Sequence, residues 1–211
     1  MGACTSLCRC CCGGKNSMKE SEMTSPRNTT TSTTKGTVLA ISRDMSQPTV
    51  EIEKDMTVSG TGLALAGVSI EQDAAYWEWH IDIPNGQISN CIMFGVTTKK
   101  DSKFYEKLDD AEEDTPNTNG TSLMNVVSPL HDGDTIGVAV QQSDLPMIQF
   151  LLNGEPQHDL SIHRFRGAVY PSLRLPVGET VRATLVLDER EFRHVPPHAR
   201  FGPVIVSRGI I

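Results

Sequence analysis

The sequence contains few aromatic residues and fewer basic than acidic ones. Aromatic side chains make up 5% of the 211 residues, and 19 Lys and Arg stand against 26 Asp and Glu. Proteins that bind nucleic acids usually carry a basic patch or stripe, often with aromatic side chains. The composition therefore disfavours nucleic acid as a partner. The formal net charge of −7 would also lead an anionic membrane leaflet to repel the body of the protein.

Long apolar runs and catalytic motifs are also missing. No stretch approaches the roughly 18 apolar residues that a membrane-spanning helix needs. Leu7 is the only large aliphatic residue near the start, which leaves no apolar core for a secretory signal. No serine stands in a G-x-S-x-G elbow, and Gly60-Thr61-Gly62 lacks the Lys-Ser/Thr of a P-loop and reads as a glycine-rich strand or bulge. We expect no catalytic residues and no cofactor.

Cysteine is scarce except at the N-terminus. Cys91 lies inside an apolar run and is expected to be a buried, inert thiol. Gly2, followed by three residues and Ser6, matches the N-myristoylation pattern. One myristoyl chain gives only marginal, reversible membrane binding, so a second signal is needed. We predict dual acylation at the cytosolic face of a membrane, with myristate on Gly2 and palmitate on nearby thiols, namely Cys4, Cys8, Cys10, Cys11 and Cys12.

The cysteine cluster also has three alternatives to acylation. Structural zinc sites usually pair a short cysteine knuckle with a distant second pair, and Cys91 is the only other cysteine. Disulfides between residues so close in sequence would be severely strained, and an odd number would remain. A disordered tail with reactive thiols and no lipid also fits, because the myristoylation motif is short.

The composition divides the chain into a lipid-anchor segment (1–12), a flexible linker (13–36) and one domain (37–211) with a C-terminal extension. The linker is rich in Gly, Ser and Thr and carries almost no apolar residues. The remaining 175 or so residues suit one domain with a sizeable core.

Short alternating or apolar segments bounded by turn residues fill this domain. Residues 75–83 alternate, with Tyr76, Glu78, His80 and Asp82 on one face and Trp77, Trp79, Ile81 and Ile83 on the other. Further strands are predicted at 50–53, 91–96, 135–140, 147–152, 168–173 and 181–187. Asn-Gly or Asp-Gly pairs predict turns at 85–86, 119–120, 132–133 and 153–154. This pattern, without βαβ alternation, predicts an all-β, two-sheet antiparallel β-sandwich.

Two polar segments are candidate sites. The one helical candidate, 103–114, ends in like charges that are unfavourable at a helix C-terminus, so we interpret its second half as a solvated loop. That loop would favour a basic partner through Asp109, Asp110, Glu112, Glu113 and Asp114, although solubility alone also explains it. His131-Asp132-Gly133-Asp134 contains metal-ligating residue types, but turn geometry accounts for them. We expect no metal site.

Five segments, in order, resemble motifs of the SPRY domain family. They are the aromatic-acidic Tyr76-Trp77-Glu78-Trp79, then Phe94-Gly95-Val96, the Asp132–Val138 segment, the Ile148–Gly154 hairpin and Tyr170-Pro171. Together they lie within roughly residues 55–190. The resemblance implies a β-sandwich whose end loops bind peptide segments of partner proteins, without enzymatic activity.

The sequence departs from its SPRY-like relatives in the acidic segment 101–118 and in Gly2, and it has no RING or SOCS-box beside the domain. The hypothesis is therefore a monomeric, non-enzymatic protein-interaction module tethered to the cytosolic face of a membrane. One alternative is a soluble, untethered adaptor. Another is an enzyme with a pocket between the sheets, in which His131, Asp134 or His80 would converge.

Overall fold

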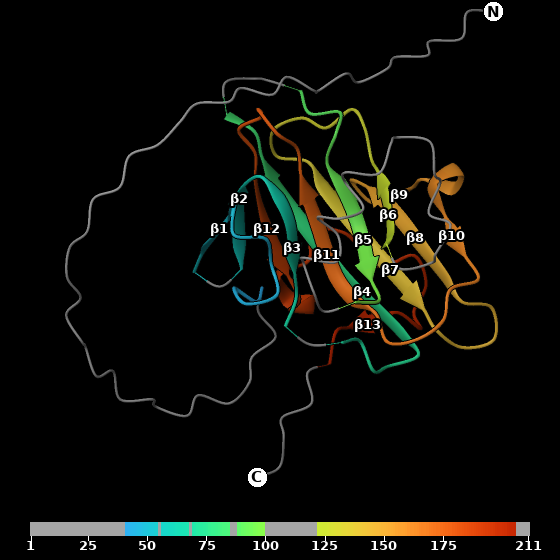
Figure 1. Ribbon diagram of the computed structural model, residues 1–211. Helices are drawn as coiled ribbons and strands as arrows, with labels where there is room; N and C mark the ends of the chain where they lie inside the picture. Colours follow the sequence, from blue (N-terminus) through green and yellow to red (C-terminus); the bar gives the residue numbers. More distant parts are fainter. Residues whose placement is uncertain (1–40, 55, 68, 85–87, 100–121, 206–211) are drawn as a thin grey trace, which may run out of the picture. The chain divides into compact units, whose positions relative to one another are not determined.

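The computed structural model describes residues 41–54, 56–67, 69–84, 88–99 and 122–205, which form β-strands and two short 3-10 helices (Figure 1). The strands are β1 (Val50–Glu53), β2 (Thr57–Gly60), β3 (Gly62–Leu65), β4 (Ala74–Asp82), β5 (Met93–Thr97), β6 (Ser122–Val126), β7 (Thr135–Gln141), β8 (Met147–Leu152), β9 (Glu155–Pro156), β10 (Ile162–His163), β11 (Tyr170–Leu175), β12 (Arg182–Val186) and β13 (Gly202–Pro203). The 3-10 helices are η2 (His158–Leu160) and η3 (Glu189–Glu191).

The strands form two sheets. The larger has the order β1-β2-β12-β4-β7-β8-β10, with β9 added beside β8 and β13 beside β4, and the smaller has the order β3-β11-β5-β6. Within the described residues the pairings of these strands are antiparallel, apart from the parallel contact between β13 and β4. The predicted two-sheet antiparallel sandwich is therefore confirmed.

The core lies between the two sheets, where β11 and β5 lie over β4 and β7 (Figure 1). Trp77 and Trp79 of β4 are fully buried there, together with Phe94 of β5 and Leu173 of β11. Aromatic side chains of this size bury about 150–250 Å² each and dominate core energetics. The apolar face predicted for residues 75–83 is thus the inner face of the larger sheet.

The glycine-rich segment Gly60-Thr61-Gly62 is where the chain leaves the larger sheet for the smaller one, between β2 and β3. Both glycines have positive φ, 84° and 105°. A Cβ on Gly62 would also clash with the side-chain oxygen of Gln47, which accepts a hydrogen bond from the Leu63 N–H at 2.6 Å. The glycines therefore serve a corner between sheets.

The turn predicted at Asn153-Gly154 joins β8 to β9, with Leu152 paired to Glu155. Both turn residues have positive φ, 50° and 84°, as a two-residue type I′ turn requires. At Asp132-Gly133, Gly133 has a φ of 83° and Asp132 Oδ1 accepts from the Ile83 N–H at 3.0 Å. The turns predicted at 85–86 and 119–120 lie outside the described residues.

Several predictions concern parts of the chain outside the described residues. These are the anchor residues Gly2, Cys4, Cys8, Cys10, Cys11 and Cys12, the linker 13–36, and the acidic residues Asp109, Asp110, Glu112, Glu113 and Asp114. In the described ranges, no helix has the length and apolar character needed to cross a membrane. Cys91 was predicted to be buried, but it is only half-buried, just before β5.

Candidate functional site

Residues 192–205, termed the strap, cross the outer face of the larger sheet. β12 pairs with β4 only as far as Val186, which lies opposite Glu78. Beyond that point β13 takes its place and pairs in parallel with Ala75 and Tyr76. The strap thus fills an edge of β4 that would otherwise expose unpaired backbone groups.

The strap covers the polar face of β4. Alternation correctly places Tyr76 and Glu78 opposite the two tryptophans, but both are completely buried and His80 is half-buried. A charged residue is almost never fully buried unless it is paired. The contacts of Glu78 therefore determine what this face can do.

The Glu78 carboxylate accepts four hydrogen bonds, two at each oxygen. Oε1 accepts from the Tyr76 hydroxyl at 3.1 Å and from the His194 backbone N–H at 2.9 Å. Oε2 accepts from the Arg193 backbone N–H at 2.8 Å and lies 2.9 Å from His80 Nε2. All four lone-pair sites of the carboxylate are occupied, so Glu78 anchors the strap to the sheet.

Two opposing effects set the ionisation of Glu78. Burial disfavours the charged carboxylate, whereas the hydrogen bonds from His80, from the Arg193 and His194 N–H groups and from Tyr76 favour it, and together they lower the pKa of Glu78. Burial, followed by the charge and hydrogen bond of Glu78, raises the pKa of Tyr76. An ionised carboxylate with no free lone pair and no access to solvent is suited to structure and not to proton transfer.

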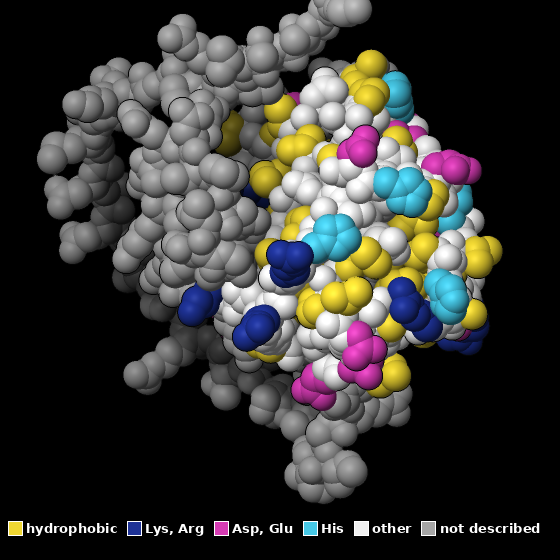
Figure 2. Space-filling view, turned by 90° about the vertical axis from the view of Figure 1, so that its right-hand side faces the viewer, with side chains coloured by type: hydrophobic (Ala, Val, Ile, Leu, Met, Phe, Trp, Pro, Cys, Tyr) yellow, Lys and Arg dark blue, Asp and Glu magenta, His cyan; other side chains and the backbone are white. Residues whose placement is uncertain are grey.

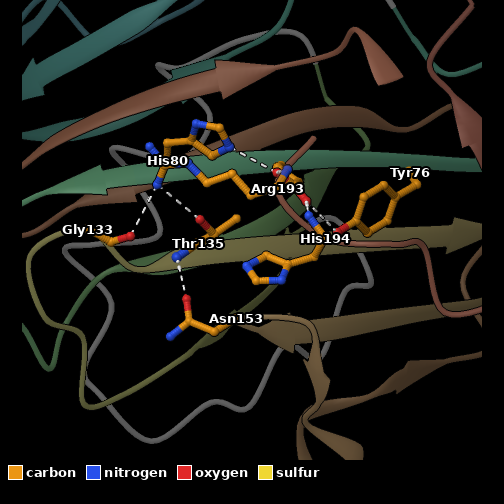
Figure 3. Close-up of polar contacts among 8 residues, drawn as sticks. Tyr76, His80, Gly133, Thr135, Asn153, Arg193 and His194 are labelled. Carbon is orange, nitrogen blue, oxygen red and sulfur yellow. Dashed lines mark hydrogen bonds and ion pairs between the residues drawn. The ribbon is translucent and has the colours of Figure 1, made fainter. Parts of the chain in front are cut away.

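A second set of polar contacts fixes the strap beside the β8–β9 turn (Figure 3). The Arg193 guanidinium donates to the Gly133 carbonyl at 3.2 Å and to Thr135 Oγ1 at 3.3 Å. Asn153 accepts from the Thr135 N–H at 2.9 Å and donates to Asp134 Oδ1 at 2.8 Å. The Asp132–Asp134 segment is therefore engaged in turn contacts, and no metal-binding group of His, Cys, Asp or Glu occurs among the described residues.

Apolar contacts complete the attachment of the strap. Phe192 packs edge-on against Tyr76, with ring centroids 5.1 Å apart and an interplanar angle of 84°. Phe201 is buried against Tyr76 of β4, Ala139 of β7 and Leu151 of β8. The strap thus covers an apolar patch on three adjacent strands of the larger sheet.

The end of the strap forms one wall of a surface groove, termed the β12 groove. It has a volume of about 670 Å³. Its apolar lining consists of Met56, Leu185, Val186, Leu187, Pro203 and Val204. Its rim carries the successive charged residues Asp188, Glu189, Arg190 and Glu191 of the η3 segment. The groove is therefore apolar inside and predominantly acidic at its edge.

The residues proposed for an enzyme do not converge. His80 lies 2.9 Å from Glu78, whereas His131 lies 3.6 Å from Asp134 in an exposed turn. None of His80, His131 and Asp134 lines the β12 groove or the second groove, of about 530 Å³, between the start of β4 and the end of the strap. The described residues thus do not bring these three side chains together in either groove.

Sequence reasoning missed the role of Glu78 and the β12 groove. A glutamate between two tryptophans on a buried strand was a usable signal, because such a carboxylate needs partners wherever the strand is covered. The partners are 115 and 116 residues away in sequence, so no local pattern identified them. The groove likewise combines residues near positions 56, 187 and 204.

On the face shown in Figure 2, Lys and Arg side chains lie among apolar, acidic and histidine side chains.

Stability should depend on pH through the Glu78–Tyr76 pair. The pKa of Glu78 is lowered by folding, so its contribution is full above the ordinary value of 4.5 and is lost as the pH falls through the folded value. The pKa of Tyr76 is raised by folding, so its contribution is full below 10.0 and declines as the pH rises further. Urea unfolding measured from below pH 4.5 to above pH 10.0 checks both the acidic and the alkaline loss of stability. Tyr76→Phe should reduce the decline of the free energy of unfolding above pH 10.0. An unchanged decline in this variant would contradict its assignment to Tyr76.

Comparisons with known proteins give structural neighbours only. No protein-family model and no curated protein matches the sequence. Similar solved structures include the SPRY domain of human HERC1 (15% identity, 69% of this chain and 96% of that chain, TM-score 0.47). They also include the NHR1 domain of Drosophila melanogaster neuralized (11% identity, 69% of this chain and 96% of that chain, TM-score 0.46). A third is the PSpry domain of TRIM65 (12% identity, 71% of this chain and 90% of that chain, TM-score 0.45). These three neighbours are thus SPRY and NHR domains.

Proposed function

We propose that this chain is a non-enzymatic protein-interaction module, built on a SPRY-like sandwich and tethered to the cytosolic face of a membrane by N-terminal acylation. The β12 groove carries the proposal, because a concave apolar surface with a polar rim is typical of a recognition site. Within the groove, Asp188 and Arg190 bind each other, with Arg190 Nε 3.0 Å from Asp188 Oδ1. They form an exposed ion pair and not a catalytic arrangement.

The positions of the SPRY-like segments support this assignment. Three of these segments occupy strands β4, β7 and β8 and the turns beside them. The three strands are adjacent in the larger sheet. The other two occupy β5 and β11, which are adjacent in the smaller sheet. The glycines before β4, the Arg166–Pro171 segment and the start of the strap, Phe192–Pro197, also resemble SPRY domain-containing protein 7. That protein, too, has a cysteine-rich segment ahead of a SPRY domain.

The tether half of the proposal rests on the N-terminal sequence. Gly2 supplies a myristoylation site and the five following cysteines supply sites for a second acyl chain. A flexible linker of residues 13–36 would span roughly 25–30 Å. That reach would let the domain present its surface in several orientations beside the membrane.

The interaction half is tested by proximity labelling in cells. The full chain, fused to a biotin ligase, is compared with Leu187→Arg, which places a charge in the groove, and with Leu145→Arg, which makes the same change on an exposed loop. Leu187→Arg should lose a set of labelled proteins that Leu145→Arg retains. Identical labelling by all three chains would contradict an interaction through the groove.

The tether is tested by membrane fractionation. Gly2→Ala combined with Ser at Cys4, Cys8, Cys10, Cys11 and Cys12 should move the chain from the membrane pellet to the supernatant, because both acyl chains are lost. Gly2→Ala alone and the cysteine substitutions alone should each give partial release. A fully substituted chain that pellets as before would reject the tether, and wild-type chain in the supernatant would indicate the untethered adaptor.

A further inference from the structure

The edge of β12 beside the groove is only partly paired. β12 pairs with β2 at Ala183 and Thr184, and the Leu185 N–H donates to the Met56 carbonyl at 2.8 Å. The chain then turns back at Lys54, whose φ is 49°, toward β1. Among the described residues, the larger sheet therefore has no neighbour for β12 beyond Leu185 on this side.

Leu187 lies at this unpaired edge. Leu187 directly follows the last residue of β12, two residues beyond Leu185, and alternate residues of an extended strand direct their backbone groups to the same side. Among the hydrogen bonds of the described residues, none involves the N–H or the C=O of Leu187. Leu187 itself is half-buried in the lining of the groove. The described part of the chain therefore offers no partner to this donor and acceptor, which lie beside an apolar surface.

We propose that the β12 groove binds an extended peptide segment that pairs with the backbone of Leu187 and carries Lys or Arg beside its apolar residues. This inference rests on the proposed function and names its partner class. An extended segment is required because a helix uses its own N–H and C=O groups internally, whereas an added strand can pair with a sheet edge and place alternate side chains in pockets.

The charge of the groove's rim is the reason for proposing Lys or Arg in the bound peptide. Three carboxylates (Asp188, Glu189 and Glu191) and one guanidinium (Arg190) give the rim a net charge of −2. Arg190 is bound by Asp188, and Glu189 and Glu191 are exposed. A second copy of this chain, with its net charge of −7, would meet this rim with repulsion. Charge complementarity therefore favours a basic peptide from another protein.

The test begins with a display library of random peptides about ten residues long, which is enough for one strand, selected against the full chain. Enriched peptides should combine alternating apolar residues with Lys or Arg. The best one is synthesised, and its affinity is measured by fluorescence anisotropy. Glu189→Lys with Glu191→Lys should weaken binding about tenfold or more, which corresponds to 1.4 kcal/mol. Glu51→Lys with Glu155→Lys, the same charge change at exposed sites outside the groove, should change the affinity less than about twofold.

Amide hydrogen exchange at Leu187 gives a second readout, which should slow about tenfold in the complex because its N–H becomes bonded. Enriched peptides that bind both charge variants equally and leave Leu187 unprotected would reject the groove while leaving the proposed function intact. Protection of Leu187 without any effect of Glu189→Lys and Glu191→Lys would reject a basic partner. Failure to enrich any peptide would reject this inference, whereas the proposed function is decided separately by the labelling of Leu187→Arg against Leu145→Arg.

Discussion

Replacing Glu78 by Gln should lower the free energy of unfolding by about 3 kcal/mol. The side chain would keep its shape but present an NH₂ group where one carboxylate oxygen now accepts. In one orientation this group faces the Arg193 N–H, and in the other it faces the His194 N–H. A buried strap N–H is left without an acceptor in either case, and the remaining bonds lose their charge assistance.

Urea unfolding of the full chain measures this loss. Glu155→Gln makes the same chemical change at an exposed residue of β9 and should shift the unfolding midpoint little. Amide exchange of Arg193 and His194 should accelerate in Glu78→Gln more than exchange in the inner strands. Equal midpoints for Glu78→Gln and the wild type would show that Glu78 does not anchor the strap.

Replacing Phe201 by Ala should cost about 3–4 kcal/mol, the typical loss for a large aromatic side chain in a core. Phe201 is 4% exposed and fills the space over Tyr76, Ala139 and Leu151. The strap is held at both ends, so the surrounding side chains have limited freedom to close the cavity. Thermal or urea unfolding measures the effect, with Val195→Ala as the control, because Val195 lies on the same strap and is 84% exposed. Equal losses for the two variants would contradict burial of Phe201 beneath the strap.

Combining Glu78→Gln with Phe201→Ala distinguishes a strap that acts as one unit from two independent contacts. If either substitution releases the whole strap, the double variant should lose less stability than the sum of the single losses. Both variants should also weaken peptide binding in the β12 groove, because Pro203 and Val204 form one of its walls. Strict additivity would place the two contacts in separate units.

The sequence was sufficient to predict the two-sheet sandwich and the strands β1, β4, β5, β7, β8, β11 and β12, whereas the strands β2, β6, β9, β10 and β13 were not predicted. The predicted strand 147–152 matches β8 at both ends, and the alternation in 75–83 separates the inner face of β4, with Trp77 and Trp79, from the outer face, with Tyr76 and Glu78. These features depend on side-chain period and turn chemistry, which are local properties. The Asn153-Gly154 turn was predictable for the same reason, because few other residue pairs adopt two successive positive φ values.

The covering of the outer face was not predictable in this way. Alternation shows that Glu78 and Trp77 point to opposite sides, but it does not show which element covers either side. The segment with two prolines around Pro196 has no regular period, yet it supplies the N–H groups that Glu78 binds. Contacts across more than a hundred residues depend on chain topology, and neither composition nor spacing records them.

The strap also constrains how this protein can be made. Synthesis adds residues from the N-terminus at roughly 5–20 per second, so β4, β7 and β8 exist before the strap does. Until Phe192 and Phe201 have been synthesised, Tyr76 and Leu151 lack the side chains that cover them in the folded domain. The nascent domain must therefore carry an exposed apolar patch and an unanchored Glu78 for several seconds. Any chain interrupted before the strap would keep both, as a substrate for chaperones and proteases.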